Sequence, residues 1–430
     1  MIKELFLQEH KKLWKKKSVR ISFLLCVLYI VVFGSFLTYQ WFTFGSSRGT
    51  YSGFGNNFDG YENIRKMKEY AKQWEGEMTD EKLQEMVRDY QALVRGAEAA
   101  HSAGDREKES LYAEQAQRTD RSSIGSWIST LYPELEDSSQ TYPSLLERYV
   151  DPAELTGFYE RRQQKVEEYL DIFGHTEEEK EYLLQMNDRV KEPFVYHWLE
   201  GWKLYLTQML NDFGMVMAVF IVIALSTVFA GEWHNGMGML MLTTKNGWRE
   251  VAYAKVLSGI AFTLELFFTI AAGAVAGQLI YLGTEGWDMP IQYIKLIAVA
   301  PMNMLQAEIY EYVYFLLGSV GLALLVMFFS AVARNNFIAL VSGLAIVYLP
   351  MALTGYMPMQ VQRVFDLIPL VGSPSDIFRT NVFHMFGQII WSPYLLITIP
   401  VILGCAFIPF TVRRWAGRLK LEFPQNVIPK

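Results

Sequence analysis

The sequence predicts an all-α polytopic membrane protein with six transmembrane helices and a large helical extracytoplasmic domain between the first two. Hydrophobic residues make up 51% of the 430 residues, and charged residues only 20%. The apolar residues gather in runs of about 18 to 25, long enough to cross a hydrocarbon core of about 30 Å as helices. These two observations exclude a soluble protein.

Hydropathy places six spans along the chain, at 21–42, 209–230, 256–282, 310–332, 337–353 and 395–412. The first span is too long for the apolar region of a signal peptide, so we expect it to stay as an anchor. Only four residues join the fourth span to the fifth. These two spans should therefore form a tight helical hairpin.

Lysine and arginine beside the spans predict the orientation, because cationic residues near span ends resist translocation. Four segments are basic: the N-terminal tail, the loop after the second span, the turn that contains Arg334, and the C-terminal tail. In a six-span chain all four lie on one side, which predicts that both termini are cytoplasmic. The outer segment, 43–205, then carries 32 acidic against 20 basic residues.

The outer segment is mostly helical by pattern. Residues 45–60 are rich in Gly, Ser and Asn and should form a loop. Apolar residues at helical spacing over 83–94 predict a helix. The stretch 97–120 is charged, rich in alanine and interrupted by glycine, which fits either a solvated helix or a mobile loop.

Two helix starts can be placed in the second half of the outer segment. Asp151 followed by Pro152 is an N-cap with proline at the first helical position, and it predicts a helix running through Leu170. Thr176 followed by Glu179 is a capping box that begins another helix.

Common catalytic and metal motifs are missing from the sequence. No glycine is followed by lysine, so there is no phosphate-binding P-loop, and no His-Glu-x-x-His helix occurs. Cys26 and Cys405 both fall in apolar runs, which argues against a disulfide or a zinc site. We therefore expect no catalytic residue, no metal site and no cofactor on this chain, which is not an enzyme, and no nucleic acid among its partners.

The loop 231–255 after the second span carries the most specific pattern. A carboxylate is followed by a glycine-containing turn, a short apolar helix and a polar, basic turn, which would make a small helix on the cytoplasmic surface. The residues that form this pattern are Glu232, Asn235, Gly236, Met237, Thr243, Thr244, Lys245, Arg249 and Lys255.

This loop resembles the coupling segment that ABC-2 type permeases carry after their second span, although the proline usual after the threonines is missing. Two further segments resemble parts of the same family. Residues 1–20 look like its amphipathic elbow helix, and 355–393 look like its re-entrant outer helices, with apolar stretches at 367–372 and 382–391. The permease core would then be 206–430.

The resemblance implies the membrane subunit of an ATP-binding cassette transporter in a bacterial cell membrane. The transporter would export a peptide, drug-like or lipophilic substrate. A separate ATP-binding subunit would hold ATP and Mg²⁺, and a second permease, identical or related, would complete the dimer. Residues 232–249 would couple the two subunits, with Glu232 and Arg249 as anchors. The acidic outer domain would suit a cationic substrate, or its charge would serve solubility alone.

Charges inside the spans are the remaining candidates. Glu265 is the clear case: it would line a transport path, carry a proton or cation, or satisfy a polar group on a neighbouring helix. Asp212, Glu308 and Glu311 lie near outer span ends, where we expect water to reach them.

Two other functions stay open. A membrane sensor or assembly factor would use the outer domain to bind a ligand and would need no ATPase. An ion-coupled secondary transporter would use Glu265 as its coupling site and should show internal repeats, which the sequence lacks.

Overall fold

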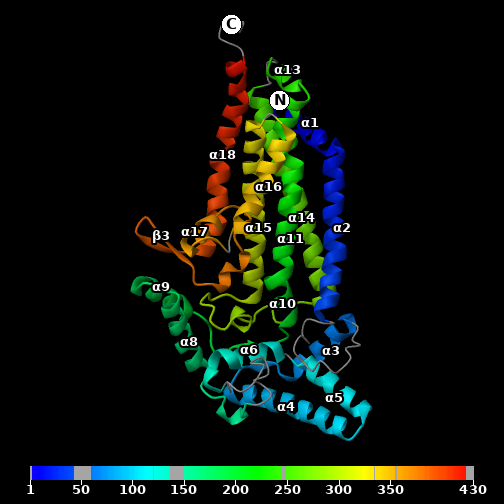
Figure 1. The fold of residues 1–430 in the computed structure, drawn as a ribbon, viewed down its shortest axis with the longest axis vertical. Coiled ribbons are helices and arrows are strands. Elements are labelled where there is room, and N and C mark those ends of the chain that lie inside the picture. Colours follow the sequence, from blue (N-terminus) through cyan, green and yellow to red (C-terminus); the bar gives the residue numbers. More distant parts are fainter. Residues whose placement is uncertain are drawn as a thin grey trace.

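The computed structural model describes residues 2–42, 60–119, 121–135, 150–243, 248–333, 335–353 and 356–422. These residues form a bundle of long helices with a helical domain at one end (Figure 1). The helices α1 (Ile2–Lys15) and α13 (Met237–Thr243) and the C-terminal end of α18 (Ser392–Glu422) lie at the opposite end of the bundle from that domain.

Six helices among the described residues are long and apolar enough to cross a membrane, as the sequence predicts. The first is α2 (Lys17–Gln40), and the second runs from Glu200 to His234 through α10 (Glu200–Leu204), a π-helical turn (Tyr205–Met209), α11 (Leu210–Leu225) and α12 (Thr227–His234). The other four are α14 (Arg249–Gly277) with a π-helical turn to Leu282, α15 (Met304–Val332), α16 (Asn336–Leu353) and α18 (Ser392–Glu422).

Close helix contacts in the bundle are made at glycines. The position that a Cβ would take on Gly214 in α11 lies against the Phe315 ring of α15, and that on Gly259 in α14 lies against the Met327 sulfur. Larger side chains there would push α11 and α14 away from α15. Small residues thus set the spacing around α15, as is common between membrane helices.

The helical domain comprises α3 (Gly60–Gln73), α4 (Asp80–Ser102), α5 (Arg106–Arg118), α6 (Arg121–Leu131), α8 (Phe158–Ile172) and α9 (Glu177–Asn187). The predicted helix over 83–94 and the capping box of Thr176 and Glu179 are both confirmed. Within 97–119 the structure has helix, with Asp105 capping α5. A two-stranded pair of β1 (Gly76–Glu77) and β2 (Val195–Tyr196) closes the domain. The predicted loop at 45–60 lies outside the described residues except for Gly60.

The helix predicted from Asp151 is wrong in its start. Asp151 caps only a short 3₁₀ turn, Pro152–Glu154, and α8 begins after Gly157, which has a positive φ of 72°. The carboxylate of Asp80 on α4 accepts hydrogen bonds from the backbone N–H groups of Gly157 and Phe158, at 2.7 and 3.0 Å. A tertiary contact therefore caps α8, and a local sequence pattern could not reveal it.

The helical form expected for the outer segment 382–391 is also wrong. These residues form a hairpin of β3 (Val382–Met385) and β4 (Gln388–Trp391), which follows the short α17 (Met359–Phe365) and a 3₁₀ helix, Pro374–Phe378. The two turn residues, Phe386 and Gly387, have positive φ angles of 53° and 76°. This backbone suits a two-residue turn that reverses a twisted strand pair. The apolar content of the segment reflects strand residues.

Two carboxyl groups that we expected near water are buried. The structure leaves Glu308 5% exposed and Glu311 0% exposed, both on α15. Gln278 donates a hydrogen bond to Glu308 at 3.1 Å. Neither carboxyl oxygen of Glu311 has a hydrogen-bond partner among the described residues. The expectation failed because Glu308 faces Gln278 at the end of the third span and Glu311 is enclosed by its neighbours in the bundle.

Replacing Glu311 by methionine is expected to raise the stability of the protein by about 1–3 kcal/mol, because it removes a buried polar group that makes no hydrogen bond. Glu308→Met should instead lower it, since Gln278 loses its acceptor. Thermal unfolding of both variants in one detergent compares them. Equal losses in both variants would contradict the expectation for Glu311.

Candidate functional site

The candidate site lies where the N-terminal helix α1 (Ile2–Lys15) crosses the bundle. The helix is interrupted at Lys16, whose extended backbone (ψ 125°) separates α1 from α2. The helix α1 packs on α14. Leu13 is its buried apolar anchor, and its lysines lie toward the outside of the molecule or toward α12. The predicted amphipathic helix is therefore present, and it contacts the bundle directly.

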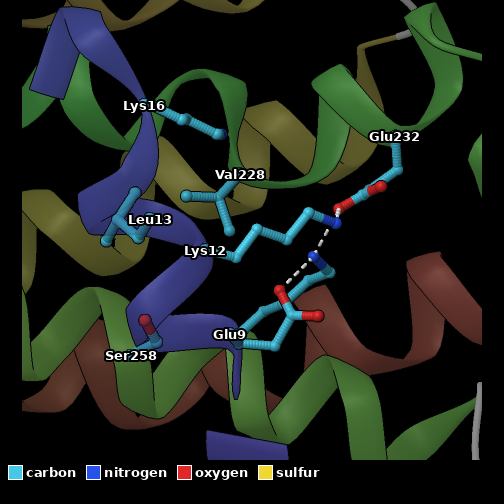
Figure 2. Close-up of a pocket in the computed structure, with 8 residues that line it drawn as sticks. Glu9, Lys12, Leu13, Lys16, Val228, Glu232 and Ser258 are labelled. Atoms are coloured by element: carbon cyan, nitrogen blue, oxygen red, sulfur yellow. Dashed lines mark hydrogen bonds and ion pairs between the residues drawn. The ribbon is translucent and has the colours of Figure 1, made fainter. Parts of the chain in front are cut away.

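A network of alternating charges joins α1 to both helices that flank the loop 231–255. The Lys255 ammonium donates to Glu9 Oε2 at 2.6 Å and to Glu232 Oε1 at 2.7 Å. Lys12 donates to the same Glu232 oxygen at 2.5 Å. Figure 2 shows Glu9 from α1 and Glu232 from α12 extending toward each other in the small pocket between the helices. We call these four residues the α1 charge network.

Burial makes this network more than a surface contact. Lys255 is 2% exposed and Glu232 is 6% exposed. Lys16 lies beside them and donates to the Thr227 backbone oxygen at 3.3 Å and to its hydroxyl at 3.0 Å. Burial lowers the pKa of Lys16 to about 8, and the charge of Lys255 adds to this shift. Removing the charge of Glu232 or Lys255 would therefore leave a buried partner with less compensation.

The turn between α12 and α13 follows the sequence prediction. Asn235 ends α12, and Gly236 has a positive φ of 72°, which glycine adopts without strain. The short helix α13 (Met237–Thr243) then begins, with Met237 46% exposed and Leu240 61% exposed. Two exposed apolar side chains therefore lie on a helix at the end of the bundle where α1 lies.

The remaining predicted residues have separate places. Arg249 is exposed at the start of α14 and forms no ion pair with a described residue. Thr244 and Lys245 lie outside the described residues, and only the backbone of Thr243 is described. The structure therefore brings Glu232 together with α1 and leaves Arg249 apart from it.

Glu265 also contacts α1. It accepts a hydrogen bond from the Trp14 indole at 2.9 Å and lies 3.0 Å from the His10 ring. Its side chain is 45% exposed. Of the roles considered for Glu265, the contact with polar groups on a neighbouring helix is the one these distances support, and its role in a transport path stays a prediction.

Sequence reasoning missed Glu9, Lys12 and the pairing role of Lys255. Lys255 could have been noticed by its spacing, because it shares a helical face with Ala252, Ser258, Gly259 and Phe262, all of which are buried. A lysine on an otherwise apolar, small-residue face needs a counter-charge. Its partners could not be named, since Glu9 lies 246 residues earlier in the chain.

A second polar cluster joins the helical domain to the β3–β4 hairpin. Glu179 on α9 lies 2.9 Å from His384 of β3 and 3.4 Å from His175, and His175 lies 3.0 Å from the Thr380 hydroxyl. Burial lowers the pKa of His175, although Glu179 opposes this effect, and the charges of Arg363 and Lys180 add to it. Burial raises the pKa of Glu179, but hydrogen bonds from the Thr176 N–H and His384 outweigh this effect and hold the pKa below its ordinary value.

The protein is expected to lose stability as the pH falls below about 6.5. Because the pKa of His175 is lower in the folded protein than its ordinary value of 6.5, folding favours the neutral ring, and acid must charge a buried group. Thermal unfolding between pH 8 and pH 5 measures the effect. His175→Gln should flatten the profile, because it removes the buried ring that acid would have to charge. An unchanged profile in His175→Gln would contradict this assignment.

Six long apolar helices indicate a multi-pass membrane protein. Comparisons with protein-family models, with curated proteins and with solved structures find no match to this chain.

Proposed function

We propose that this chain is the permease subunit of an ABC-2 type transporter and that a separate ATP-binding subunit drives it. The observation that carries this proposal is the α1 charge network. It connects α1 to α12 through Glu232, at the start of the loop 231–255, and to α14 through Lys255, at the end of that loop. A push on that loop would move α1, α12 and α14 together.

The surface that would receive the push is α13. Met237 and Leu240 expose apolar side chains there, at the end of the bundle where α1 lies (Figure 1). Exposed apolar side chains on a surface helix suit contact with a partner protein. In this proposal the end with α1 and α13 is cytoplasmic, and the helical domain stands outside the cell membrane.

The mechanism follows from this arrangement. ATP closes two copies of the partner subunit, their motion presses on α13 and α1, and two permeases, identical or related, rock against each other. The substrate, a peptide, drug-like or lipophilic molecule, leaves on the side of the helical domain. The permease itself carries out no covalent chemistry.

Affinity purification of the tagged protein in mild detergent tests the proposal. We expect a P-loop ATPase to co-purify, and the variant Met237→Ser with Leu240→Ser should reduce its recovery by about tenfold or more, since it removes the apolar contact. The matched control is Phe386→Ser, which removes an exposed apolar side chain from the hairpin tip. Recovery of no ATPase, or equal recovery with all three proteins, would refute the proposal.

A sensor remains the second candidate because the helical domain is firmly attached to the membrane helices. Arg162 of α8 is fully buried and donates to the backbone oxygens of Leu296 and Ala298, in the segment that precedes α15. Such a joint would pass a ligand-induced shift of the domain to a membrane helix. A chain that purifies without an ATPase but changes its protease pattern with an added ligand would support this function.

A further inference from the structure

An open cleft separates the helical domain from the segment before α15. Its volume is about 500 Å³, within the range of sites for small molecules. One wall is the chain between α9 and β2, and the other is the segment 287–306. Binding sites often form where two structural units meet in this way.

Hydrogen bonds fix both walls of the cleft. In the second wall, the Ile291 N–H donates to the Met302 backbone oxygen (3.1 Å) and the Leu305 N–H to the Trp287 backbone oxygen (3.0 Å). In the first wall, the Phe194 backbone oxygen accepts a hydrogen bond from the Met78 N–H (2.7 Å). Prolines at 193, 290 and 301 further restrict the backbone. The cleft is therefore preformed and would not have to be ordered by a ligand.

The cleft is basic within an acidic domain. Arg189 and Lys191 line it, both are exposed, and neither forms an ion pair with a described residue. Asp288 is the one carboxylate among the lining residues, so the lining carries a net positive charge. The outer segment as a whole has twelve more acidic than basic residues. A positive cleft in a negative surface selects for an anion.

The other lining groups are apolar or neutral. The Trp287 side chain is 49% exposed, and it offers a flat apolar surface at the mouth of the cleft. Gln292 lies in the lining and is fully buried. Its amide nitrogen donates to the oxygens of Ala298 and Ala300, but its Oε1 has no hydrogen-bond partner among the described residues. A buried acceptor left without a donor is rare unless a ligand or water supplies one.

We propose that this cleft binds an anionic amphiphile, with its phosphate or carboxylate at Arg189 and Lys191 and its apolar part against Trp287. Two sources share this chemistry: a soluble compound and the headgroup of an anionic lipid. The site goes beyond transport and does not depend on the permease proposal, because it lies on the helical domain's side of the bundle, away from α13 (Figure 1).

Calorimetric titration of the full-length protein in nanodiscs of neutral phosphatidylcholine tests the proposal. The probes are 1-naphthyl phosphate and its uncharged analogue 1-naphthol. We expect saturable binding of the phosphate and at least about tenfold weaker binding of the alcohol, as charge-assisted hydrogen bonds are lost. Nanodiscs containing phosphatidylglycerol distinguish the two sources: competition by this lipid means a headgroup site, and unchanged binding means a site for soluble anions.

Variants locate the binding. Arg189→Gln with Lys191→Gln should lower the affinity for 1-naphthyl phosphate by about tenfold or more. Arg88→Gln with Arg95→Gln makes the same change in charge on exposed residues of α4 and should leave the affinity within about twofold. Trp287→Leu should lower the affinity for both 1-naphthyl phosphate and 1-naphthol. Absence of saturable phosphate binding by the wild type, or equal weakening in both double variants, would overturn the proposal.

Discussion

Glu232→Gln is expected to destabilise the protein by about 3 kcal/mol, at the lower end of the effect of breaking a buried ion pair. The substitution keeps the shape of the side chain but removes the charge that Lys255 and Lys12 share. Lys255 would keep Glu9 as its partner, which limits the loss. Thermal unfolding in detergent measures the stability, and protease cleavage near Lys16 reports whether α1 has been released.

Glu250→Gln is the matched control for this prediction. Glu250 lies in the first turn of α14 and forms no ion pair with a described residue, so the stability should change by no more than about 0.5 kcal/mol. Adding Lys255→Met to Glu232→Gln should cost less than Lys255→Met alone, since the two residues are coupled. If the two changes are strictly additive, the α1 charge network does not hold the helices together.

Arg162→Met should detach the helical domain from the segment before α15, with a cost of about 3–5 kcal/mol. The guanidinium is 0% exposed and donates to Asn187 Oδ1 at 2.7 Å as well as to the oxygens of Leu296 and Ala298. Methionine fills a similar volume but leaves these acceptors unsatisfied. Hydrogen exchange of residues 294–300 should become faster, while exchange within α15 stays slow.

Arg65→Met provides the comparison for Arg162. Its side chain is 66% exposed, and its one ion pair among the described residues is with Glu69, one turn further along α3. A pair of this kind contributes about 0.3–0.5 kcal/mol, so neither stability nor exchange should change appreciably. Slow exchange of 294–300 in Arg162→Met would show that other contacts hold the domain in place, such as the hydrogen bond that the Trp127 indole of α6 donates to the Tyr293 backbone oxygen.

The sequence predicted the elements that depend on local patterns. All six spans could be placed because a membrane helix must be apolar over its whole length, and the capping box at Thr176 could be placed because its two hydrogen bonds lie within four residues. The start of α8 and the hairpin at 382–391 could not. The first depends on Asp80, more than 70 residues away, and the second on a turn with Phe386 at a positive φ.

The candidate site was predicted in part for the same reason. Glu232, the turn at Gly236 and the short helix after it follow from one continuous stretch of sequence. The counter-charges of Glu232 do not, because Lys12 and Lys255 come from different helices. Glu311 gave no signal either: a carboxyl near the predicted end of a span resembles a solvated one until the chain that covers it is known.

The α1 charge network also bears on the order of events during synthesis. Glu9 leaves the ribosome 246 residues before its partner Lys255 is made. At about 5–20 residues per second, this interval lasts roughly 12–50 s. During that time the apolar face of α1, with Phe6, Leu13 and Trp14, has neither α12 nor α14 to cover it. An amphipathic helix of this kind can bury its apolar face in the membrane surface. We therefore expect α1 to lie on the membrane surface until the third span is inserted and α1 packs against it.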